Sequence, residues 1–483
     1  MPVILAVDLG GSSLRAGLVD AGGTVLAEAA VPSPPPTDDG PRSEIDPQAW
    51  WDALVTACGK LAADHPDDFE RIEGIAVCGV TRTQIFLDRD HAVLRPAMTW
   101  KDARAEGMAT AADDGHPEAA ALNAYHPAAR LRWLEANEPE TFAALAAVIE
   151  PKDYLNLCLT GVAASDRVSL QRLAAAAETH GGRALIGGAV LPPLLAPDDF
   201  VGAVRPGLPA PLDGLAGVPV ASGSNDTFAA VLGLGALRPG MAYNISGTTE
   251  VFGMVGASPA TAEGLVAVDW GEGLHHLGGP SQTGADLLRW LEPVLGGDIG
   301  KRLAGLDRAA RRNPPLLFLP FLQGERVPFW NPDLRAAFLG ADRAHGPDDF
   351  LWAALEGVAL LNALVLDRAE TAFGLPAKEV RFGGGGARSA LWAQVKADVL
   401  DRPVSTGAAA EPGLLGAAAL ALSGLGHFPS LGAAQEALAR PAATYDPESS
   451  RAAAYREMKS LFAEAHDAVA PVSKRLLGVH LPR

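Results

Sequence analysis

The sequence predicts an α/β protein of two or three domains, and three observations support this prediction. The chain has 483 residues, whereas about 150 residues is a soft guide for one domain. Short apolar runs and glycine turns alternate with segments of helical periodicity, as in α/β folds. A strand, a small-residue turn and a second strand follow one another at residues 3–19 and again at residues 241–255. This loose similarity is consistent with an internal duplication of one α/β unit.

The N-terminal segment is expected to form a β-meander. Val3–Val7 is a continuous apolar run typical of a buried strand, and Leu14–Val19 follows it as a second strand. The turn Asp20–Gly23 and the run Thr24–Val31 then predict a hairpin. Pro32–Pro41 is proline-rich and acidic, so we expect an exposed loop there.

A helix and two further strands are predicted after this loop. Asp46 is a suitable N-cap, and Pro47 suits the first helical position. Apolar residues then recur at helical spacing from Trp50 to Leu61. Ile75–Val80 and Ile85–Leu87 are expected to form short strands.

The second half repeats the strand and turn pattern. Residues 234–240 have the glycine and proline content of a boundary and precede the strand-like runs Met241–Ile245 and Val251–Val255. The strand Glu379–Phe382 is followed by four glycines and then by a predicted helix, Ser389–Leu400. Residues 455–469 have the apolar spacing of an amphipathic helix, to which we assign a structural role only.

Composition and charge exclude several functions. Hydrophobic residues make up 48% of the chain and charged residues 20%, so broad disorder is excluded. Asp and Glu number 57 against 39 Lys and Arg, which gives a net charge of −18. Such a surface repels nucleic acid and anionic membranes, so neither is expected as a partner. An anionic substrate must instead be bound by local groups such as backbone N–H nests and helix N-termini.

The cysteines and the apolar runs indicate a soluble, cytoplasmic protein. Cys58, Cys78 and Cys158 are odd in number and widely spaced, which fits neither a disulfide framework nor a Cys-x-x-Cys metal pair. The N-terminal apolar run is too short for a signal peptide. The longest weakly polar stretch, Gly413–Gly426, is too short to span a bilayer.

The turn after the first strand is a candidate phosphate site. In Asp8-Leu9-Gly10-Gly11-Ser12-Ser13 the glycines allow close approach of the backbone, and the hydroxyls can donate hydrogen bonds. Asp8 at the strand end could hold hydrated Mg²⁺. A plain hairpin turn would favour the same residue types, so the motif alone leaves both interpretations open.

Two more small-residue turns occur in the second half. Ser246–Thr249 is the counterpart of the first turn, and Gly383–Gly386 lies between a strand and a helix, where N–H groups can bind phosphate. Arg388 occupies the third glycine position of a Gly-x-Gly-x-x-Gly motif, so a dinucleotide site is not predicted. The chain also lacks a P-loop motif.

Asp226 follows the strand Val218–Val220 and a run of small residues, and it precedes an Ala- and Gly-rich segment. A carboxylate at a strand–helix junction can act as a catalytic base. The commoner role of such an aspartate is a helix N-cap, and the residues alone favour that role.

The order of these motifs resembles that of the FGGY carbohydrate kinases over nearly the whole chain. Further matching segments are Arg95–Arg104, Asp153–Leu155, Leu159–Gly161, Leu319–Trp330, Glu356–Val358 and Gly384–Asp398. The resemblance implies an α/β fold of two actin/hexokinase-like (ribonuclease H-like) domains with a cleft between them. Residues 1–238 would form the domain with the sugar side and the catalytic aspartate, and residues 239–483 the ATP side.

The family transfers the γ-phosphoryl group of ATP to a hydroxyl of a sugar or polyol. By this resemblance Asp226 is the catalytic base, and Asp8 together with Asp226 holds Mg²⁺. The implied phosphate and ATP contacts are Gly10, Gly11, Ser12, Ser13, Arg15, Gly247, Thr248, Thr249, Gly284, Gly384, Gly385 and Gly386. The implied substrate contacts are Thr81, Arg82, Trp100, Asp102 and Thr227.

The chain departs from the family at the sugar side. Arg82 stands where xylulokinases carry the histidine of Met-His-Gly, and glycerol kinases, with a glutamate there, match no better. Its guanidinium could bind several hydroxyls or an acid group, or could pair with a carboxylate of its own domain. Thr227 replaces an amide residue and Gly11 a threonine, so the substrate of xylulokinases does not transfer directly.

Three functions follow from the resemblance. The first is an ATP- and Mg²⁺-dependent kinase of a small sugar, with a ketopentose as first choice. The second is a sugar-acid (aldonate) or polyol kinase of the same family, in which Arg82 would clamp a carboxylate. The third is a non-kinase ATPase or sugar sensor on the same fold. Dimers are common among relatives, so a homodimer is an additional expectation.

Overall fold

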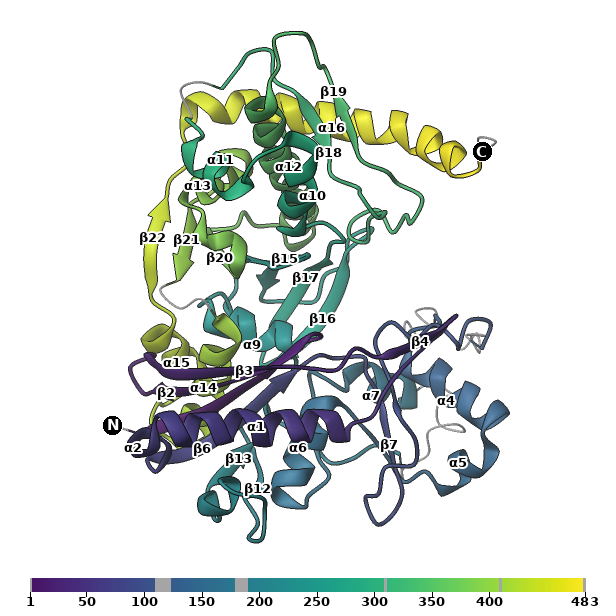
Figure 1. Ribbon diagram of the computed structural model, residues 1–483, viewed down its shortest axis with the longest axis vertical. Helices are drawn as coiled ribbons and strands as arrows, with labels where there is room; N and C mark the ends of the chain where they lie inside the picture. The colour runs from purple at the N-terminus through teal and green to yellow at the C-terminus, as the bar shows by residue number, and fades with distance from the viewer. Residues whose placement is uncertain (1, 109–122, 179–189, 308–310, 408–410, 481–483) are drawn as a thin grey trace. The chain divides into compact units, whose positions relative to one another are not determined.

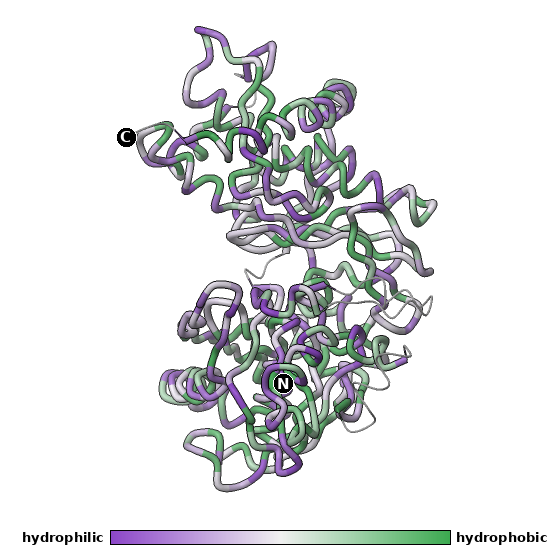
Figure 2. The backbone as a smooth tube through the Cα atoms, turned by 90° about the vertical axis from the view of Figure 1, so that its right-hand side faces the viewer, coloured by the Kyte–Doolittle hydropathy of each residue, from purple (hydrophilic) through white to green (hydrophobic). Residues whose placement is uncertain are grey.

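The computed structural model describes residues 2–108, 123–178, 190–307, 311–407 and 411–480. The chain divides into two compact units, each built around one β-sheet (Figure 1). Unit 1 comprises Met1–Gly233 and Pro412–Ala439, and unit 2 comprises Leu234–Glu411 and Arg440–Arg483. Polar and apolar stretches alternate along the chain in both units, as expected for strands and helices that each bury one face (Figure 2).

The sheet of unit 1 has six strands in the order β12-β13-β6-β1-β2-β3. The first three strands form the predicted antiparallel meander, and β6 is parallel to both β1 and β13. The carboxyl ends of β1, β6 and β13 therefore lie at one edge of the sheet. The strands are β1 Val3–Leu9, β2 Ser13–Asp20, β3 Val25–Pro32, β6 Ile72–Gly79, β12 Phe200–Ala203 and β13 Pro219–Ala221.

Smaller elements surround this sheet. Within the described part of residues 2–233, the helices are α1 Gln48–Asp64, α2 Pro66–Phe69, α4 Pro127–Asn137, α5 Pro139–Ala144, α6 Pro151–Thr160, α7 Gln171–Glu178, η1 Leu212–Leu215 and α9 Asp226–Gly233. The short strands are β4 Thr37–Asp39, β5 Arg42–Ile45, β7 Ile85–Leu87, β8 Ala97–Met98, β9 Ala147–Ile149, β10 Ser165–Asp166 and β11 Leu194–Leu195.

The expected loop at Pro32–Pro41 is exposed but not wholly irregular, because it contains β4, which pairs with β5. The predicted helix after this loop is confirmed as α1. Asp46 accepts a hydrogen bond from the N–H of Gln48 (3.0 Å) at its start.

Helices α14 (Pro412–Gly424) and α15 (Leu431–Leu438) belong to unit 1 although they follow most of unit 2 in sequence. Helix α14 packs against α9 and β1. The packing is close, because a Cβ at Gly416 would lie 1.8 Å from the carbonyl oxygen of Ala229. The predicted division at residues 238 and 239 therefore differs from the structure, which places residues 412–439 with the first unit.

The sheet of unit 2 has seven strands in the order β16-β17-β15-β14-β20-β21-β22. An antiparallel meander of β14, β15 and β17 is followed by the parallel strands β20 and β21, which reproduces the pairing in unit 1. This order matches the repeated strand pattern predicted from the sequence and is consistent with a duplication of one α/β unit. The strands are β14 Met241–Ser246, β15 Glu250–Gly256, β16 Val266–Gly271, β17 Leu274–Pro280, β20 Glu379–Gly383, β21 Val404–Gly407 and β22 Pro441–Tyr445.

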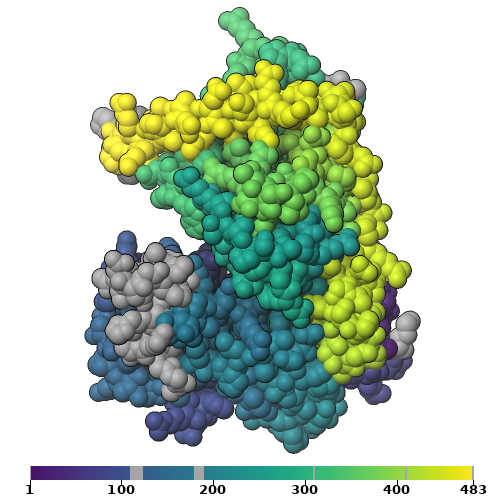
Figure 3. Space-filling model, turned by 180° about the vertical axis from the view of Figure 1, so that it is seen from behind, coloured from purple at the N-terminus to yellow at the C-terminus, as the bar shows by residue number. Residues whose placement is uncertain are grey.

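Two long helices pack in unit 2. Helix α12 (Pro347–Phe373) is long and apolar enough to span a membrane by composition, but most of it is buried within the unit. Helix α16 (Ser449–Leu477) contains the predicted amphipathic segment and lies along the surface of the unit (yellow in Figure 3). The other elements among the described residues of this unit are α10 Asp286–Leu295, α11 Ile299–Gly305, η3 Gly385–Arg388, α13 Ala390–Leu400, β18 Leu317–Leu319 and β19 Ala337–Leu339.

Candidate active site

The hairpin between β1 and β2 presents the first predicted loop at the carboxyl end of β1. The N–H of Gly10 donates to the carbonyl oxygen of Ser13 (2.9 Å), which closes a turn whose tip, Gly11 and Ser12, is exposed. Asp8 pairs with Arg15 across the strands, so their side chains lie on the same face. The guanidinium of Arg15 lies 4.0 Å from the carboxylate of Glu28, and its predicted phosphate contact stays a prediction.

Asp8 is partly buried and faces the start of α14. A Cβ at Gly413 would lie 2.2 Å from Oδ2 of Asp8, so only glycine leaves room for the carboxylate there. The carboxylate oxygens of Asp8 and Asp226 are the type of ligand that Mg²⁺ prefers. Among the described residues no cluster of three or more His, Cys, Asp or Glu side chains could hold a metal ion. One or two carboxylates, completed by water and phosphate oxygens, nevertheless fit Mg²⁺.

The turn before Asp226 crosses closely over β6. Gly223 has φ +69°, and a Cβ there would lie 1.8 Å from the carbonyl oxygen of Val77. Asn225 forms a parallel bridge with Gly79, which in turn pairs with Leu9. Asp8 and Asp226 therefore lie at the same end of the sheet, where their backbones are separated by two strand spacings, or about 10 Å, across the strands.

Asn225, and not Asp226, caps helix α9. Its Oδ1 accepts a hydrogen bond from the N–H of Phe228 (2.9 Å), which is the geometry of an N-cap. The capping role that the residues alone favoured for Asp226 is therefore wrong. The Asp226 carboxyl group accepts only from its neighbour Thr227, through N–H (2.6 Å) and Oγ1 (3.2 Å), among the hydrogen bonds resolved for it.

Burial raises the pKa of Asp226, while the hydrogen bonds from Thr227 and the charge of Arg82 oppose this rise. A carboxylate with a raised pKa is a stronger base, which suits proton abstraction from a hydroxyl group. The predicted substrate residue Thr227 thus contacts the catalytic candidate directly.

Buried charged side chains, which the sequence analysis did not identify, support the turn that precedes Asp226. Lys152, on α6, donates to the carbonyl oxygen of Ser222 (3.2 Å) and pairs with Asp166 (2.9 Å). Oδ1 of Asp166 accepts from Oγ of Ser224 (3.0 Å). All these side chains are buried. Charged neighbours flank both residues in the sequence, Asp153 beside Lys152 and Arg167 beside Asp166, so no sequence signal marked this pair as buried.

Thr81 and Arg82 follow the end of β6 at the same sheet edge. Arg82 has φ +60°, an uncommon backbone conformation for a residue with a side chain. Its charge lies close enough to Asp226 to lower the pKa of that carboxyl group against the effect of burial. The structure therefore brings Arg82 together with the catalytic candidate.

Trp100 lies near the Gly11 turn of the candidate site, whereas Asp102 is buried within its own loop. The indole Nε1 of Trp100 lies 3.9 Å from the position that a Cβ on Gly11 would take, and 41% of the residue is exposed. Asp102 is fully buried, and its carboxylate accepts from Arg104 Nε (2.9 Å) and from the N–H of Ser43 (2.7 Å). In this structure Asp102 thus supports its own loop from within, and its expected substrate contact stays a prediction.

Unit 2 gathers its predicted residues at the corresponding sheet edge. Gly247, Thr248 and Thr249 form the exposed turn between β14 and β15. The N–H of Ala285 donates to the carbonyl oxygen of Gly247 (2.9 Å). A Cβ at Gly284 would lie 2.5 Å from the backbone of Thr249, so the two segments touch.

The glycines after β20 complete this edge. Strands β14 and β20 are parallel neighbours, with Ile245 paired to Gly383. Gly384 has φ +83°, and a Cβ there would lie 2.5 Å from the carbonyl oxygen of Ser246. Gly385 is exposed and begins the 3₁₀ turn η3. Backbone groups without side chains are thus open to a ligand here, as at phosphate-binding loops.

A buried ion pair lies beneath these loops and was also missed by sequence reasoning. Lys396 Nζ lies 3.1 Å from Oε1 of Glu250, and neither side chain is exposed to solvent. Lys396 also donates to Oδ1 of Asn362 (2.6 Å), whose Nδ2 donates back to Glu250 Oε2 (3.0 Å). Glu250 directly follows Thr249, so this network anchors the turn.

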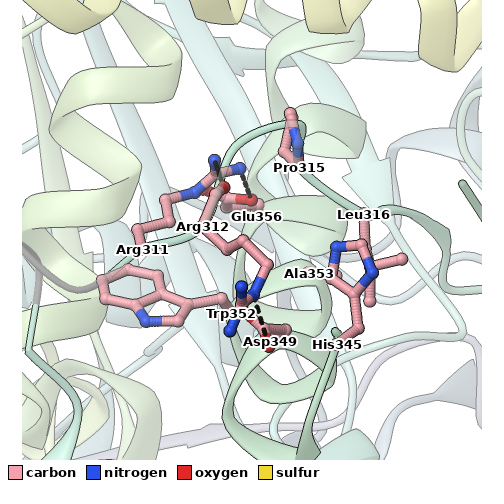
Figure 4. A pocket seen from close by; sticks show the side chains of 9 residues that line it. All are labelled: Arg311, Arg312, Pro315, Leu316, His345, Asp349, Trp352, Ala353 and Glu356. Carbon is pink, nitrogen blue, oxygen red and sulfur yellow. Dashed lines mark hydrogen bonds and ion pairs between the residues drawn. The ribbon is translucent and has the colours of Figure 1, made fainter. Parts of the chain in front are cut away.

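A small pocket elsewhere in unit 2 does not include any of the predicted site residues (Figure 4). Its Glu356 accepts hydrogen bonds from Arg311 and from the hydroxyl of Tyr455 (2.6 Å). These polar groups fasten α12 to α16, and we assign the pocket a structural role.

Comparison with known proteins agrees with this geometry. Residues 3–175 match the N-terminal domain, and residues 242–425 the C-terminal domain, of the FGGY family of carbohydrate kinases. The chain is 30% identical to the xylulose kinase of Escherichia coli over 86% of this chain and 89% of that protein. It is 32% identical to the xylulose kinase of Streptomyces coelicolor, with 87% of each chain covered.

The chain is also 25% identical to the gluconokinase of Bacillus subtilis, with 95% of this chain and 94% of that protein covered. A solved "xyloylose kinase" from Brucella ovis superposes with a TM-score of 0.86 and 27% identity, covering 97% of this chain and 100% of that chain.

Proposed function

The chain belongs to the FGGY family of carbohydrate kinases, and from this premise we propose that Asp226 is its catalytic base and that a ketopentose is its first candidate substrate. The proposal rests on the environment that the structure gives to the carboxyl group of Asp226. It is released from capping by Asn225, and burial raises its pKa. It also shares its sheet edge with Asp8.

In the proposed reaction, Asp226 takes the proton from the acceptor hydroxyl of the sugar. The hydroxyl oxygen then forms a bond to the γ-phosphorus of ATP, while the bond between that phosphorus and the β–γ bridging oxygen breaks and ADP leaves. Thr227 holds the Asp226 carboxyl group through two hydrogen bonds, which orients it toward the incoming hydroxyl.

Asp8 and Asp226 would hold Mg²⁺ together with water and phosphate oxygens. The ion would supply positive charge to neutralise the phosphates. This arrangement suits a protein of net charge −18, which cannot attract a polyanion through its surface. The exposed turns Gly10–Ser13 and Gly247–Thr249, with Gly284 and Gly384–Gly386, would bind phosphate and nucleotide through backbone N–H groups and hydroxyls. We place the enzyme in the cytoplasm, where ATP is available and its three free cysteines stay reduced.

Arg82 favours a second candidate substrate class, the sugar acids. A guanidinium presents a planar fork that matches a carboxylate, and the chain is similar to gluconokinases as well as to xylulose kinases. If an acid is the substrate, Arg82 would clamp its carboxylate beside Asp226.

Replacing Asp226 by Asn tests the catalytic assignment. We expect turnover to fall by about 10²–10⁴-fold, because general-base catalysis is lost, while the unfolding transition stays close to that of the wild type. Asp46→Asn, which alters a carboxylate at the start of α1, is the matched control and should keep its turnover. Near-normal phosphorylation by Asp226→Asn would refute the assignment.

A phosphorylation screen over ketoses, polyols and aldonates, read as ADP release, tests the substrate class. Arg82→Ala should lower kcat/KM for an acid about 10-fold or more beyond its effect on a neutral sugar, since only the acid loses a charge partner. Equal losses for both classes would exclude the carboxylate clamp. ATP and sugar binding without any phosphosugar would instead indicate a sensor.

A further inference from the structure

The backbone of Arg82 is held in a left-handed conformation that a residue with a side chain seldom adopts. Its φ is +60°, and it lies three residues beyond the end of β6. Such conformations persist only where surrounding groups fix them, and they concentrate at functional sites. The groups that fix Arg82 are two buried ionisable side chains, one on each side of the residue.

Glu150 holds the N–H side of this residue. Its Oε1 accepts hydrogen bonds from the N–H of Arg82 (2.9 Å) and from Oγ1 of Thr81 (3.0 Å). Glu150 is only 4% exposed and is itself fixed as the N-cap of α6, where its N–H donates to Oδ2 of Asp153 (3.0 Å). This acceptor therefore has little freedom to move.

Arg130, on α4, holds the carbonyl side. The guanidinium has no solvent exposure, and NH1 donates to the carbonyl oxygen of Arg82 (2.7 Å). NH2 donates to the carbonyl oxygens of Thr99 (2.7 Å) and Asp102 (3.0 Å). One side chain thus ties the Arg82 loop to the loop that carries Trp100.

Both polar groups of the Arg82 backbone are consequently occupied, by Glu150 on the N–H side and by Arg130 on the carbonyl side. The side chain of Arg82 lies where its charge acts on Asp226. We propose that Glu150 and Arg130 are positioning residues that hold Arg82 and Trp100 in the geometry that selects the sugar substrate. The proposal rests on the proposed kinase function, since it assigns these two residues a role in that same site.

A double-mutant cycle separates positioning from plain structural support. Glu150→Ala should lower kcat/KM for the sugar about 10- to 100-fold through a higher sugar KM, because a misplaced contact residue costs this much. The KM for ATP should stay unchanged. Glu150→Gln keeps an acceptor oxygen and should recover most of the loss. In an Arg82→Gly background, Glu150→Ala should then change kcat/KM less than twofold, since the Arg82 side chain that Glu150 positions is absent.

Arg130 is tested in the same way. Arg130→Met removes all the donors and should raise the sugar KM, whereas Arg130→Lys keeps the charge without the planar fork and should recover little. Glu356→Gln is the matched control, because Glu356 is also a buried carboxyl group with two side-chain donors, but in unit 2. It should leave the ratio of the sugar KM to the ATP KM unchanged.

Two kinetic results would overturn the proposal. One is that Glu150→Ala costs as much in the Arg82→Gly background as in the wild type. The other is that Glu150→Ala and Arg130→Met raise the KM for ATP and for sugar equally, as a general loss of folded enzyme would.

Amide hydrogen exchange gives a readout that does not depend on catalysis. Peptides covering residues 79–86 and 98–104 should both lose protection in Arg130→Met, and the first of them in Glu150→Ala. Unchanged protection in both variants would refute the positioning role even if the wild type is an active kinase. If the wild type phosphorylates none of the screened compounds but the variants lose this protection, the proposed function is refuted. The result would still establish that Glu150 and Arg130 hold the two loops in place.

Discussion

The two sheets have the same strand order, but they carry different residues with a positive φ just beyond corresponding strands. In unit 1 the strand parallel to the first strand ends at Gly79, and in unit 2 the corresponding strand ends at Gly383. Each is followed within three residues by a left-handed backbone conformation, with φ +60° at Arg82 and φ +83° at Gly384. One unit thus places an arginine, and the other a glycine, where the chain turns at the sheet edge.

The difference between arginine and glycine can be related to the ligand group proposed for each edge. Glycine adopts a positive φ without strain and exposes its backbone, which suits contact with a phosphate. Arginine adopts a positive φ only at a cost in conformational free energy. Hydrogen bonds from Arg82 to Glu150 and from Arg130 to Arg82 hold the residue in this conformation. If the proposed function is correct, one edge would offer a side chain to the sugar and the other would offer backbone groups to the phosphates.

Breaking the ion pair beneath the unit 2 loops should have the largest effect. Lys396→Met leaves the fully buried Glu250 without its cation, which should lower the free energy of unfolding by about 3–5 kcal/mol. Chemical denaturation measures this change. Lys459→Met is the matched control, because its ion pair with Asp367 is partly exposed and should contribute under about 1 kcal/mol. Equal losses in both variants would show that the buried pair has no special role.

Gly384→Ala should have a smaller effect on stability than the Lys396 substitution. The alanine would meet a positive φ and a contact of 2.5 Å with the carbonyl oxygen of Ser246, which should cost about 2 kcal/mol of stability. It should also raise the KM for ATP but not for sugar. At Gly385 a Cβ would lie 3.9 Å from the same oxygen, so Gly385→Ala should be nearly neutral in stability. A neutral Gly384→Ala would contradict the need for glycine.

The sequence predicted the glycine loops and the duplication because both depend on local residue types. It did not resolve whether Asp226 is a cap, since this depends on Asn225 taking the cap in three dimensions. The buried Lys396 and Glu250 are 146 residues apart, and Arg130 and Arg82 are 48 apart. A single sequence contains no signal that pairs such residues.

The assignment of α14 to unit 1 could not be predicted for the same reason. The segment begins beyond most of unit 2, and its place depends on glycines that allow close contact between helices, such as Gly416 against Ala229. The burial of Asp102 likewise depends on partners brought by the fold, Ser43 and Arg104. The position of Asp102 in the motif therefore did not reveal that its side chain is buried.

The pH dependence of stability should reveal the burial of Glu150. Burial raises the pKa of this carboxyl group to about 8, from 4.5 in the unfolded chain. Between these pH values the unfolded chain releases the proton while the folded chain keeps it, so stability falls as pH rises. Glu150→Gln has no proton to lose, and its stability relative to wild type should rise across this window by at most about 1.4 kcal/mol per pH unit. Denaturation at pH 5 and pH 8 measures this difference, and an unchanged difference would show that Glu150 ionises normally.

The smallest predicted effect compares two substitutions at Arg82 itself. Arg82→Gly and Arg82→Ala both remove the guanidinium, so both should impair sugar turnover to the same degree. They differ in the cost of the left-handed backbone, and the glycine variant should be more stable than the alanine variant by about 1 kcal/mol. Thermal unfolding of the pair measures this cost without interference from lost side-chain contacts. If the two variants unfold together, the backbone at residue 82 relaxes once the arginine is gone. The side chain, and not Glu150 and Arg130, would then hold the turn, and the contrast with Gly384 would lose its physical basis.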